Sequence, residues 1–218
     1  MMSYQIFKEN MKERFTEIIK NYAWGEFQET RCGGGSTWEY TENLRANLPI
    51  LFEQFNIKSI FDGPCGDFAW MAGVNFPEGF SYYGGDIVDF LIDNNKKIYN
   101  DRFKFEVVDL TIDKIPKVDL FFCRDLLFHL SYENINKVLQ NFIDSGSKFF
   151  ATSNHLDAVN GPDIQDGGFK LINLLASPFN FSTPIYSIKD WQLPYPPRLL
   201  LVWDREAVVN AFTKMQNN

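Results

Sequence analysis

The residues best suited to chemistry follow a short apolar run and read Asp62-Gly63-Pro64-Cys65-Gly66-Asp67. The apolar run ends in an acid, a glycine-containing turn follows, and an amphipathic segment begins at about Phe68. This pattern predicts a strand, a tight loop and a helix start. In α/β sheets, nucleotide-like ligands bind at this junction, outside the carboxyl end of the strand. Glycines let the backbone approach such a ligand, and a helix start offers free N–H groups. We therefore expect backbone contacts to a ligand from Gly63, Cys65 and Gly66.

Acids also end the next two apolar runs, at Asp86 and Asp109. In nucleotide-binding α/β folds, an acid at the end of the second strand accepts hydrogen bonds from ribose hydroxyls. Asp109 could accept from the exocyclic amine of an adenine while Leu110 packs on the ring. A lone aspartate at a strand end is more often a turn former, but three in succession beside a glycine turn favour a ligand site.

The turn is not the G-x-G-x-x-G loop that cradles a pyrophosphate. Pro64 and Cys65 interrupt that pattern, and Asp67 places a negative charge where a phosphate would lie. A carboxylate-rich pocket suits a cation better. S-adenosylmethionine (SAM) combines a sulfonium, an amine, a ribose and an adenine, and we expect Asp62 and Asp67 beside its positive groups.

The segment from Asp62 to Met71 resembles motif I of the class I SAM-dependent methyltransferases. It has the Asp-x-x-Cys-Gly-Asp-Phe-x-Trp-Met form of a group of bacterial and viral proteins, many of them found near glycosyltransferases and associated with glycan biosynthesis. Phe68 stands where the wider class has a third glycine, so the loop is expected to hold the cofactor slightly differently. Further segments that resemble this group are 33–40, 84–88, 123–131 and 178–181.

The resemblance implies an α/β fold, a Rossmann-like, mostly parallel seven-stranded sheet with the last strand antiparallel and helices on both faces. It also implies cofactor contacts from the resembling segments. In addition to the residues above, the contacts expected on this ground are Ser36, Trp38, Pro64, Trp70, Ile87 and Cys123.

The chain has only two histidines, His129 and His155, and each follows a predicted strand at the cofactor edge. A hydroxyl is a poor nucleophile, and histidine is the most common general base for activating it. If its segment is helical, Asp125 lies one turn before His129 and could orient the imidazole. His155 is expected to contact the acceptor or to act as the base itself. The alternatives are that His129 only closes the sheet edge and that His155 is solvated.

Arg124 adjoins the predicted cofactor site, and we expect it to bind the methionine carboxylate bidentately. The competing interpretation is an ion pair with Asp125 or Asp62. The loop 33–38 either folds over the cofactor, with Ser36 and Thr37 donating to the carboxylate, or is a mobile linker.

A divalent metal is a further alternative, because carboxylate and imidazole groups lie near the two histidines. No close ligand spacing supports it, so we expect no metal site. The residues concerned are Asp125, His129, His155 and Asp157.

Alternating apolar strands and amphipathic segments predict a parallel sheet covered on both faces. We expect a single domain, 1–218, with a helical N-terminal cap in 1–56, a cofactor-binding core in 57–153 and an acceptor region with the last strands in 154–218. Expected helices are 4–20 (with Phe7, Met11, Phe15 and Ile18 at helical spacing), 41–55, from about 68, 87–99 and 131–143. Expected strands are 58–62, 82–86, 103–109, 118–124, 148–153 and 198–204.

The composition and charge of the chain favour a globular protein that does not act on nucleic acid. Of the 218 residues, 45% are hydrophobic, which is typical of a globular chain. The net charge of −7 without a Lys/Arg block argues against a nucleic-acid substrate. No apolar run could span a membrane and no signal peptide is visible, so we expect a cytoplasmic protein. Its three widely spaced cysteines are then expected to stay reduced.

These observations predict a SAM-dependent methyltransferase that acts on a hydroxyl of a small or sugar-like acceptor and releases S-adenosylhomocysteine (SAH). Aromatic and polar side chains in 154–197 suit a carbohydrate, which favours glycan O-methylation. The alternatives are N-methylation of a small amine, in which a base matters less, and a non-catalytic cofactor-binding partner of a glycosyltransferase.

Overall fold

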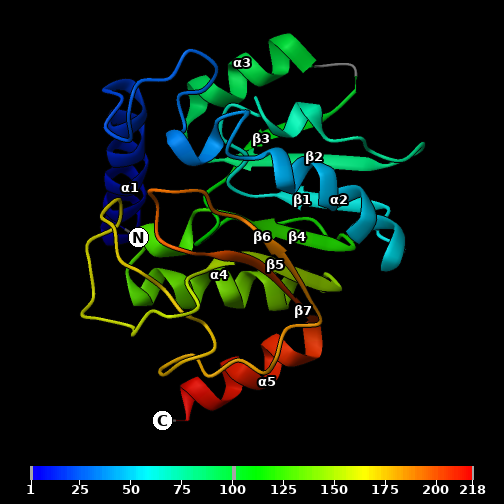
Figure 1. Cartoon of the computed structure of the whole chain (residues 1–218). Coiled ribbons are helices and arrows are strands. Elements are labelled where there is room, and N and C mark those ends of the chain that lie inside the picture. The colour runs from blue at the N-terminus through cyan, green and yellow to red at the C-terminus, as the bar shows by residue number, and fades with distance from the viewer. Residues whose placement is uncertain (1, 100–101, 218) are drawn as a thin grey trace.

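A computed structural model of the chain describes residues 2–99 and 102–217, except the side chains of residues 2–10. A seven-stranded sheet with strand order β3-β2-β1-β4-β5-β7-β6 forms its centre (Figure 1). The last strand, β7, is antiparallel to both of its neighbours. The strands are β1 Ser59–Asp62, β2 Ser81–Asp86, β3 Lys104–Val107, β4 Leu120–Cys123, β5 Phe149–Asn154, β6 Tyr186–Lys189 and β7 Leu199–Asp204. The mostly parallel seven-stranded sheet is therefore confirmed, although β6 lies in a region where no strand was expected.

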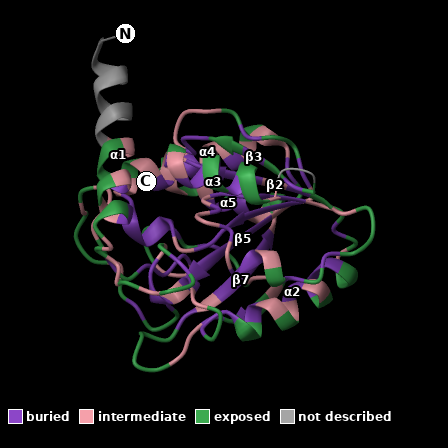
Figure 2. Cartoon of the chain, turned by 90° about the horizontal axis from the view of Figure 1, so that it is seen from above, coloured by how far each residue is buried: buried purple, intermediate pink, exposed green. Residues whose placement is uncertain are grey.

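Helices cover both faces of the sheet. α2 lies on one face, and α4 and α5 lie on the other (Figures 1 and 2). Buried side chains of α1 join the cluster on the α4 side. The helices are α1 Met2–Lys20, α2 Glu42–Gln54, α3 Asp89–Tyr99, α4 Tyr132–Ser145 and α5 Arg205–Gln216. The first four were expected within a few residues, although the side chain of Phe7 lies outside the described residues. No helix was expected at α5.

The helix expected from about Phe68 is wrong. Phe68 has a φ of 58°, in the left-handed region that a right-handed helix cannot contain. Its buried ring contacts four other rings at centroid distances of 4.8–5.2 Å. The chain then forms turns and one short 3₁₀ helix, Met71–Gly73. Packing of the Phe68 ring thus overrides the local helical pattern, so the ligand-side N–H groups belong to a turn and not to a helix start.

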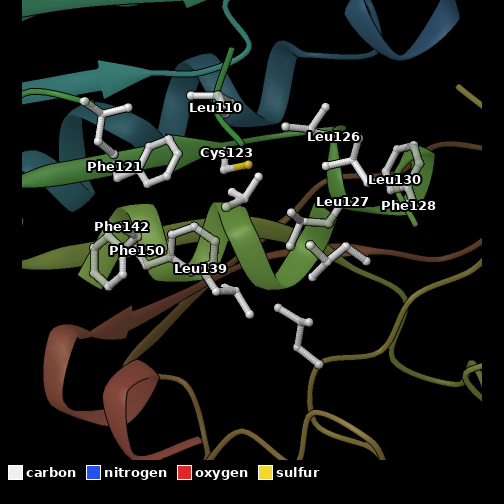
Figure 3. Close-up of a cluster of buried hydrophobic side chains, with 14 of the residues drawn as sticks. Leu110, Phe121, Cys123, Leu126, Leu127, Phe128, Leu130, Leu139, Phe142 and Phe150 are labelled. Atoms are coloured by element: carbon white, nitrogen blue, oxygen red, sulfur yellow. The ribbon is translucent and has the colours of Figure 1, made fainter. Parts of the chain in front are cut away.

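Alternate residues of the central strands point to opposite faces of the sheet. Phe121 and Cys123 of β4 pack with α4, where Leu139 and Phe142 are fully buried (Figure 3). Leu120 and Phe122 belong to the cluster on the other face, with α2. Burial on both faces explains why these strands are continuous apolar runs.

The ends of α4 follow the expected capping pattern. The hydroxyl oxygen of Ser131 accepts a hydrogen bond from the N–H of Asn134, and Gly146 takes a left-handed φ of 70°.

Within the described residues, no helix has both the length and the apolar character required to cross a membrane.

Candidate active site

A cavity lies at the carboxyl ends of β1, β2 and β4 and against the loop after β3. The expected site residues that line it are Ser36, Asp62, Pro64, Cys65, Gly66, Trp70, Asp86, Ile87, Asp109, Leu110, Arg124 and Asp125. The topology thus brings together residues from five separate parts of the sequence.

Asp109 has an unsatisfied hydrogen-bond acceptor. Its Oδ1 accepts from the N–H and the hydroxyl of Thr111, at 3.0 and 2.6 Å. Its Oδ2 is the only fully buried side-chain oxygen or nitrogen among the described residues that has no hydrogen-bond partner. An unsatisfied buried acceptor is costly. Because Asp109 lines the cavity beside Leu110, a ligand with an N–H donor can satisfy this oxygen.

Asp86 connects the glycine turn to the end of β2. Its two carboxylate oxygens accept from the N–H groups of Gly66 and Val88, each at 2.9 Å. Burial raises its pKa to about 6, an effect that these two hydrogen bonds oppose. Each carboxylate oxygen can accept a second hydrogen bond, so Asp86 retains acceptor capacity toward the cavity.

Asp62 is buried at the end of β1 and accepts a hydrogen bond from the hydroxyl of Tyr82. Burial raises its pKa to about 8, although the Tyr82 hydrogen bond opposes the shift. Asp62 is therefore mainly protonated at neutral pH until a cation enters the cavity beside it.

Asp67 accepts hydrogen bonds from a neighbouring loop. Its Oδ2 accepts from the Thr30 hydroxyl at 2.8 Å and from the Arg31 N–H at 2.7 Å. The next residue of that loop, Cys32, packs against Gly66 so closely that a Cβ on Gly66 would lie 2.6 Å from its Sγ. Asp67 thus anchors this loop over the turn, although it was expected beside the positive groups of a cofactor.

Arg124 is buried, and its bidentate partner is Asp190. The Nε and Nη2 groups donate to the two Asp190 carboxylate oxygens at 2.9 and 2.8 Å, and Nη2 also donates to the Gly35 carbonyl at 2.7 Å. The Nη1 group lies 3.2 Å from Asp125. The expected ion pair with Asp125 is present, whereas the bidentate geometry expected for a methionine carboxylate is occupied by Asp190.

The loop 33–38 is packed and is not a linker. Its first part forms a short 3₁₀ helix, Gly34–Ser36, and Ser36 lines the cavity. The Thr37 hydroxyl, expected to face the cofactor, donates instead to the Gly34 carbonyl at 3.0 Å. Trp38 is 51% exposed with the Arg45 guanidinium over its ring, so it lies outside the cavity and the expected contact is wrong.

Two more expected contacts lie outside the cavity. Gly63 donates its N–H to the Phe122 carbonyl, and a Cβ at this position would lie 2.8 Å from the ring of Phe61. The absence of a side chain at Gly63 therefore allows close packing at the end of β1. Cys123 is fully buried in the apolar cluster of Figure 3 and faces α4, because strand alternation turns it away from the ligand edge.

The expected pairing of Asp125 with His129 is wrong. Asp125 has a φ of 57°, and only Leu127–His129 form a short 3₁₀ helix, so the two side chains do not share an α-helical face. The Asp125 carboxylate accepts from the Ser153 hydroxyl at 2.7 Å and from Arg198 at 2.9 Å. The neighbouring guanidiniums of Arg124 and Arg198 lower the pKa of Asp125 despite its burial. It is a fixed anion at the cavity wall.

His129 is oriented by a backbone carbonyl. Its Nδ1 lies 2.6 Å from the Gly168 carbonyl oxygen, and its ring stacks on Trp24 with centroids 4.8 Å apart. A carbonyl only accepts, so Nδ1 carries the hydrogen. Burial lowers the pKa of His129, which leaves a neutral ring with a lone pair on Nε2. Trp24 lines the cavity but His129 does not, so the imidazole lies behind this part of the wall.

His155 has the opposite tautomer. It is buried rather than solvated, and its Nδ1 accepts from the N–H of Ile172 at 3.3 Å. Burial lowers its pKa, so the single hydrogen of the neutral ring is on Nε2. His155 also lies outside the cavity lining. This hydrogen-bonding pattern favours His129 over His155 as a proton acceptor.

An apolar wall of the cavity was not expected from the sequence. The amphipathic stripe of α1 was visible, but nothing local shows that it lies over the strand ends. Of the described side chains, no group of three or more His, Cys, Asp or Glu is arranged to hold a metal ion. The unexpected apolar lining residues are Met11, Phe15, Ile19, Trp24, Val88, Leu91, Val108, Phe122, Leu126 and Leu130.

No protein-family model matches this sequence, and no curated protein matches it significantly. Solved structures match its fold. Magnesium protoporphyrin IX methyltransferase (ChlM) from Synechocystis PCC 6803 with bound SAH has a TM-score of 0.62 at 15% identity, over 89% of this chain and 98% of that chain. Human N-acetylserotonin methyltransferase (ASMT) in complex with SAM has 0.59 at 16% identity, over 87% of this chain and 59% of that chain.

The chain has the fold of SAM-dependent methyltransferases. The methyltransferase domain of bacterial CtHen1 also matches, with a TM-score of 0.56 at 12% identity over 76% of this chain and 99% of that chain. At these identities the likeness is one of fold, and the chemistry has to be argued from the cavity itself.

Proposed function

We propose that the chain is a SAM-dependent methyltransferase. The observation that carries this proposal is the unpaired Oδ2 of Asp109 in the wall of the cavity. It matches the exocyclic amine of an adenine, with Leu110 beside the ring. Asp86 has acceptor capacity for the ribose hydroxyls, and Asp62 and Ser36 line the same cavity and are proposed to contact the methionyl part. This set of donors and acceptors supports SAM as the ligand.

The charge of the cavity supports a cationic cofactor. Among the described lining residues the only cation is Arg124, and it is already paired with two carboxylates. The described lining therefore offers no free cation for a phosphate, whereas the sulfonium and ammonium of SAM would favour the ionised form of the buried Asp62. The acidic lining residues are Asp62, Asp67, Asp86, Asp109 and Asp125.

The acceptor we propose is a hydroxyl of a small or sugar-like molecule, in keeping with glycan O-methylation. The acceptor oxygen would attack the methyl carbon, the bond from that carbon to sulfur would break, and SAH would leave as a neutral thioether. The hydroxyl proton needs an acceptor, and His129 offers a neutral Nε2. Because its ring lies behind Trp24 and outside the cavity lining, the acceptor would have to reach it from the side of Phe169. The exposed Phe169 ring lies 5.9 Å from the His129 ring and 6.4 Å from the His155 ring, and it offers an aromatic face near both.

Calorimetry with SAM tests the first part of this proposal, and the absence of binding would refute it. Incubation with SAM and a panel of nucleotide sugars, oligosaccharides and small amines tests the second part by SAH release. Turnover with hydroxyl acceptors is expected. Turnover confined to amines would show that the acceptor is an amine and not a hydroxyl. Tight SAM binding without SAH release on any glycan extract would favour a non-catalytic, cofactor-binding partner of a glycosyltransferase.

A further inference from the structure

A cluster of two arginines and two aspartates lies beside the cavity: Arg124, Asp190 and Arg198 are buried, and Asp125 is partly exposed. The sheet topology assembles it. Since β4 and β6 run in the same direction and β7 runs in the opposite one, the residues just after β4 and β6 meet the residue just before β7. Asp190 is distant from Arg124 in sequence, and no local pattern pairs them.

Asp190 holds two arginines at once. Its side chain is completely buried and binds Arg124 bidentately, while its backbone carbonyl accepts from the Arg198 Nε at 2.9 Å and from the Tyr40 hydroxyl at 3.3 Å. A buried guanidinium is stable only where its charge is matched. The two aspartates match the two arginines, so the cluster is neutral as a whole.

The cluster continues to the cavity through Gly35. Arg124 donates to the Gly35 carbonyl at 2.7 Å, and the next residue, Ser36, lines the cavity. The loop lies directly on the charged groups. A Cβ on Gly35 would lie 3.0 Å from an Asp125 carboxylate oxygen and 3.1 Å from Arg198 Nη2, so a larger residue requires either the loop or these charged groups to shift.

We propose that Asp190 is a positioning residue of the cofactor site. It fixes the Arg124 guanidinium, which in turn holds the Gly35 carbonyl and Ser36 at the end of the cavity that receives the methionyl group. This inference rests on the proposed function, because it assumes that SAM fills the cavity with its adenine at Asp109. Asp190 itself does not touch the cofactor.

The substitution Asp190→Asn tests the proposal. An amide can accept from only one of the two Arg124 nitrogens and leaves the cation unmatched. We expect the affinities for SAM and SAH, measured by calorimetry, to fall about 10-fold, as for a lost hydrogen bond to a charged group. The affinity for adenosine, which lacks the methionyl group and reaches only Asp86 and Asp109, should change less than about twofold.

Asp119→Asn is the matched control. Asp119 precedes β4 at the opposite edge of the sheet, where it accepts from the N–H groups of Lys58 and Ser59 and pairs with Lys148. Its replacement should lower the melting temperature and leave the ratio of SAM affinity to adenosine affinity unchanged.

Gly35→Ala gives an independent test if Asp190→Asn does not fold. It leaves every charge in place but displaces the loop from the cluster, and it should again weaken SAM and spare adenosine. Equal losses for SAM and adenosine in the folded variants, or unchanged SAM affinity, would overturn the positioning role. A wild-type protein that binds neither ligand would refute the proposed function instead.

Discussion

Asp109 keeps one carboxylate oxygen without a partner, while the other oxygen is fully used by Thr111. Such an arrangement costs stability unless a ligand completes it. The same logic applies to His129, whose Nδ1 is bound to Gly168 while Nε2 keeps its lone pair. The unpaired Oδ2 of Asp109 therefore leads to a prediction about cofactor binding, and the Nε2 of His129 leads to one about turnover.

Asp109→Asn should weaken SAM binding about 10-fold, because the amide can keep the contacts to Thr111 only by presenting its NH₂ group to the adenine amine. The stability of the free protein should change little, since an unpaired buried NH₂ group replaces an unpaired buried oxygen. Calorimetry and thermal unfolding measure the two effects. Wild type should prefer adenosine to inosine, which lacks the amine, and the variant should lose that preference; an unchanged SAM affinity would contradict the assignment.

His129→Ala should reduce turnover on the true acceptor about 100-fold through loss of a general base. It should leave SAM affinity nearly unchanged, because His129 does not line the cavity. Since the pKa of His129 is lowered from 6.5, wild-type activity should rise with pH below that value and be level above neutrality. His155→Ala is the comparison, with a smaller loss expected. Full turnover by the His129→Ala variant would rule out His129 as the general base.

Two elements close over the cavity from outside the sheet. α1 contributes Met11, Phe15 and Ile19 to the wall, and the loop 24–36 contributes Trp24 and Ser36 among others. Lys12 pairs with Asp89 of α3, and Arg14 donates to Gln165 at 3.3 Å, so α1 spans the cofactor half and the region expected to hold the acceptor (Figure 1). Both elements must then respond to cofactor binding.

We expect SAM to slow amide hydrogen exchange in residues 11–36, because a ligand that contacts only the closed form stabilises it against local opening. Mass spectrometry of exchanged peptides measures this directly. Residues of α5 serve as the internal reference, as α5 contributes nothing to the cavity lining. Protection restricted to the strand ends around Asp62 and Asp86 would show that α1 is not part of the cofactor site.

The pH dependence of stability of the molecule is expected to reflect its buried acids. Five aspartates share the cavity wall, and burial raises the pKa of Asp62 to about 8 and that of Asp86 to about 6. When the pKa of a group is higher in the folded protein than in the unfolded chain, its protonated form stabilises the folded state. This contribution is complete at pH values below the unfolded pKa and is lost as pH rises through the folded pKa. For Asp62 the loss extends from about pH 4 to about pH 8.

The free energy of unfolding of the free protein should therefore decline between pH 7 and 8.5, and Asp62→Asn should remove much of that decline. Cofactor binding should release a proton from Asp62 near pH 7, because a cation favours the carboxylate. Calorimetry in buffers of different ionisation enthalpy measures the release. Identical pH slopes for wild type and variant, with no proton release, would contradict a protonated Asp62.

Local patterns were enough to predict strands β1–β5 and β7 and helices α1–α4, because doubly buried strands require apolar runs and helices need a periodic stripe and caps. β6 escaped detection because its sequence, Tyr186–Lys189, contains no continuous apolar run. The helix after Phe68 was predicted wrongly because the ring of that residue packs into a distant aromatic cluster.

The α/β class and the polar residues of the cavity could be predicted from the sequence, since each of the early strand ends is marked by a residue that needs a partner. The partners themselves depend on the tertiary structure. Arg124 binds Asp190, Asp125 binds Arg198, and His129 binds Gly168. These pairs are distant in sequence, and the order β4-β5-β7-β6 and the loop after β5 bring them together. Spacing along a chain predicts neighbours only within one helix or strand, so contacts across a sheet edge could not be predicted from it.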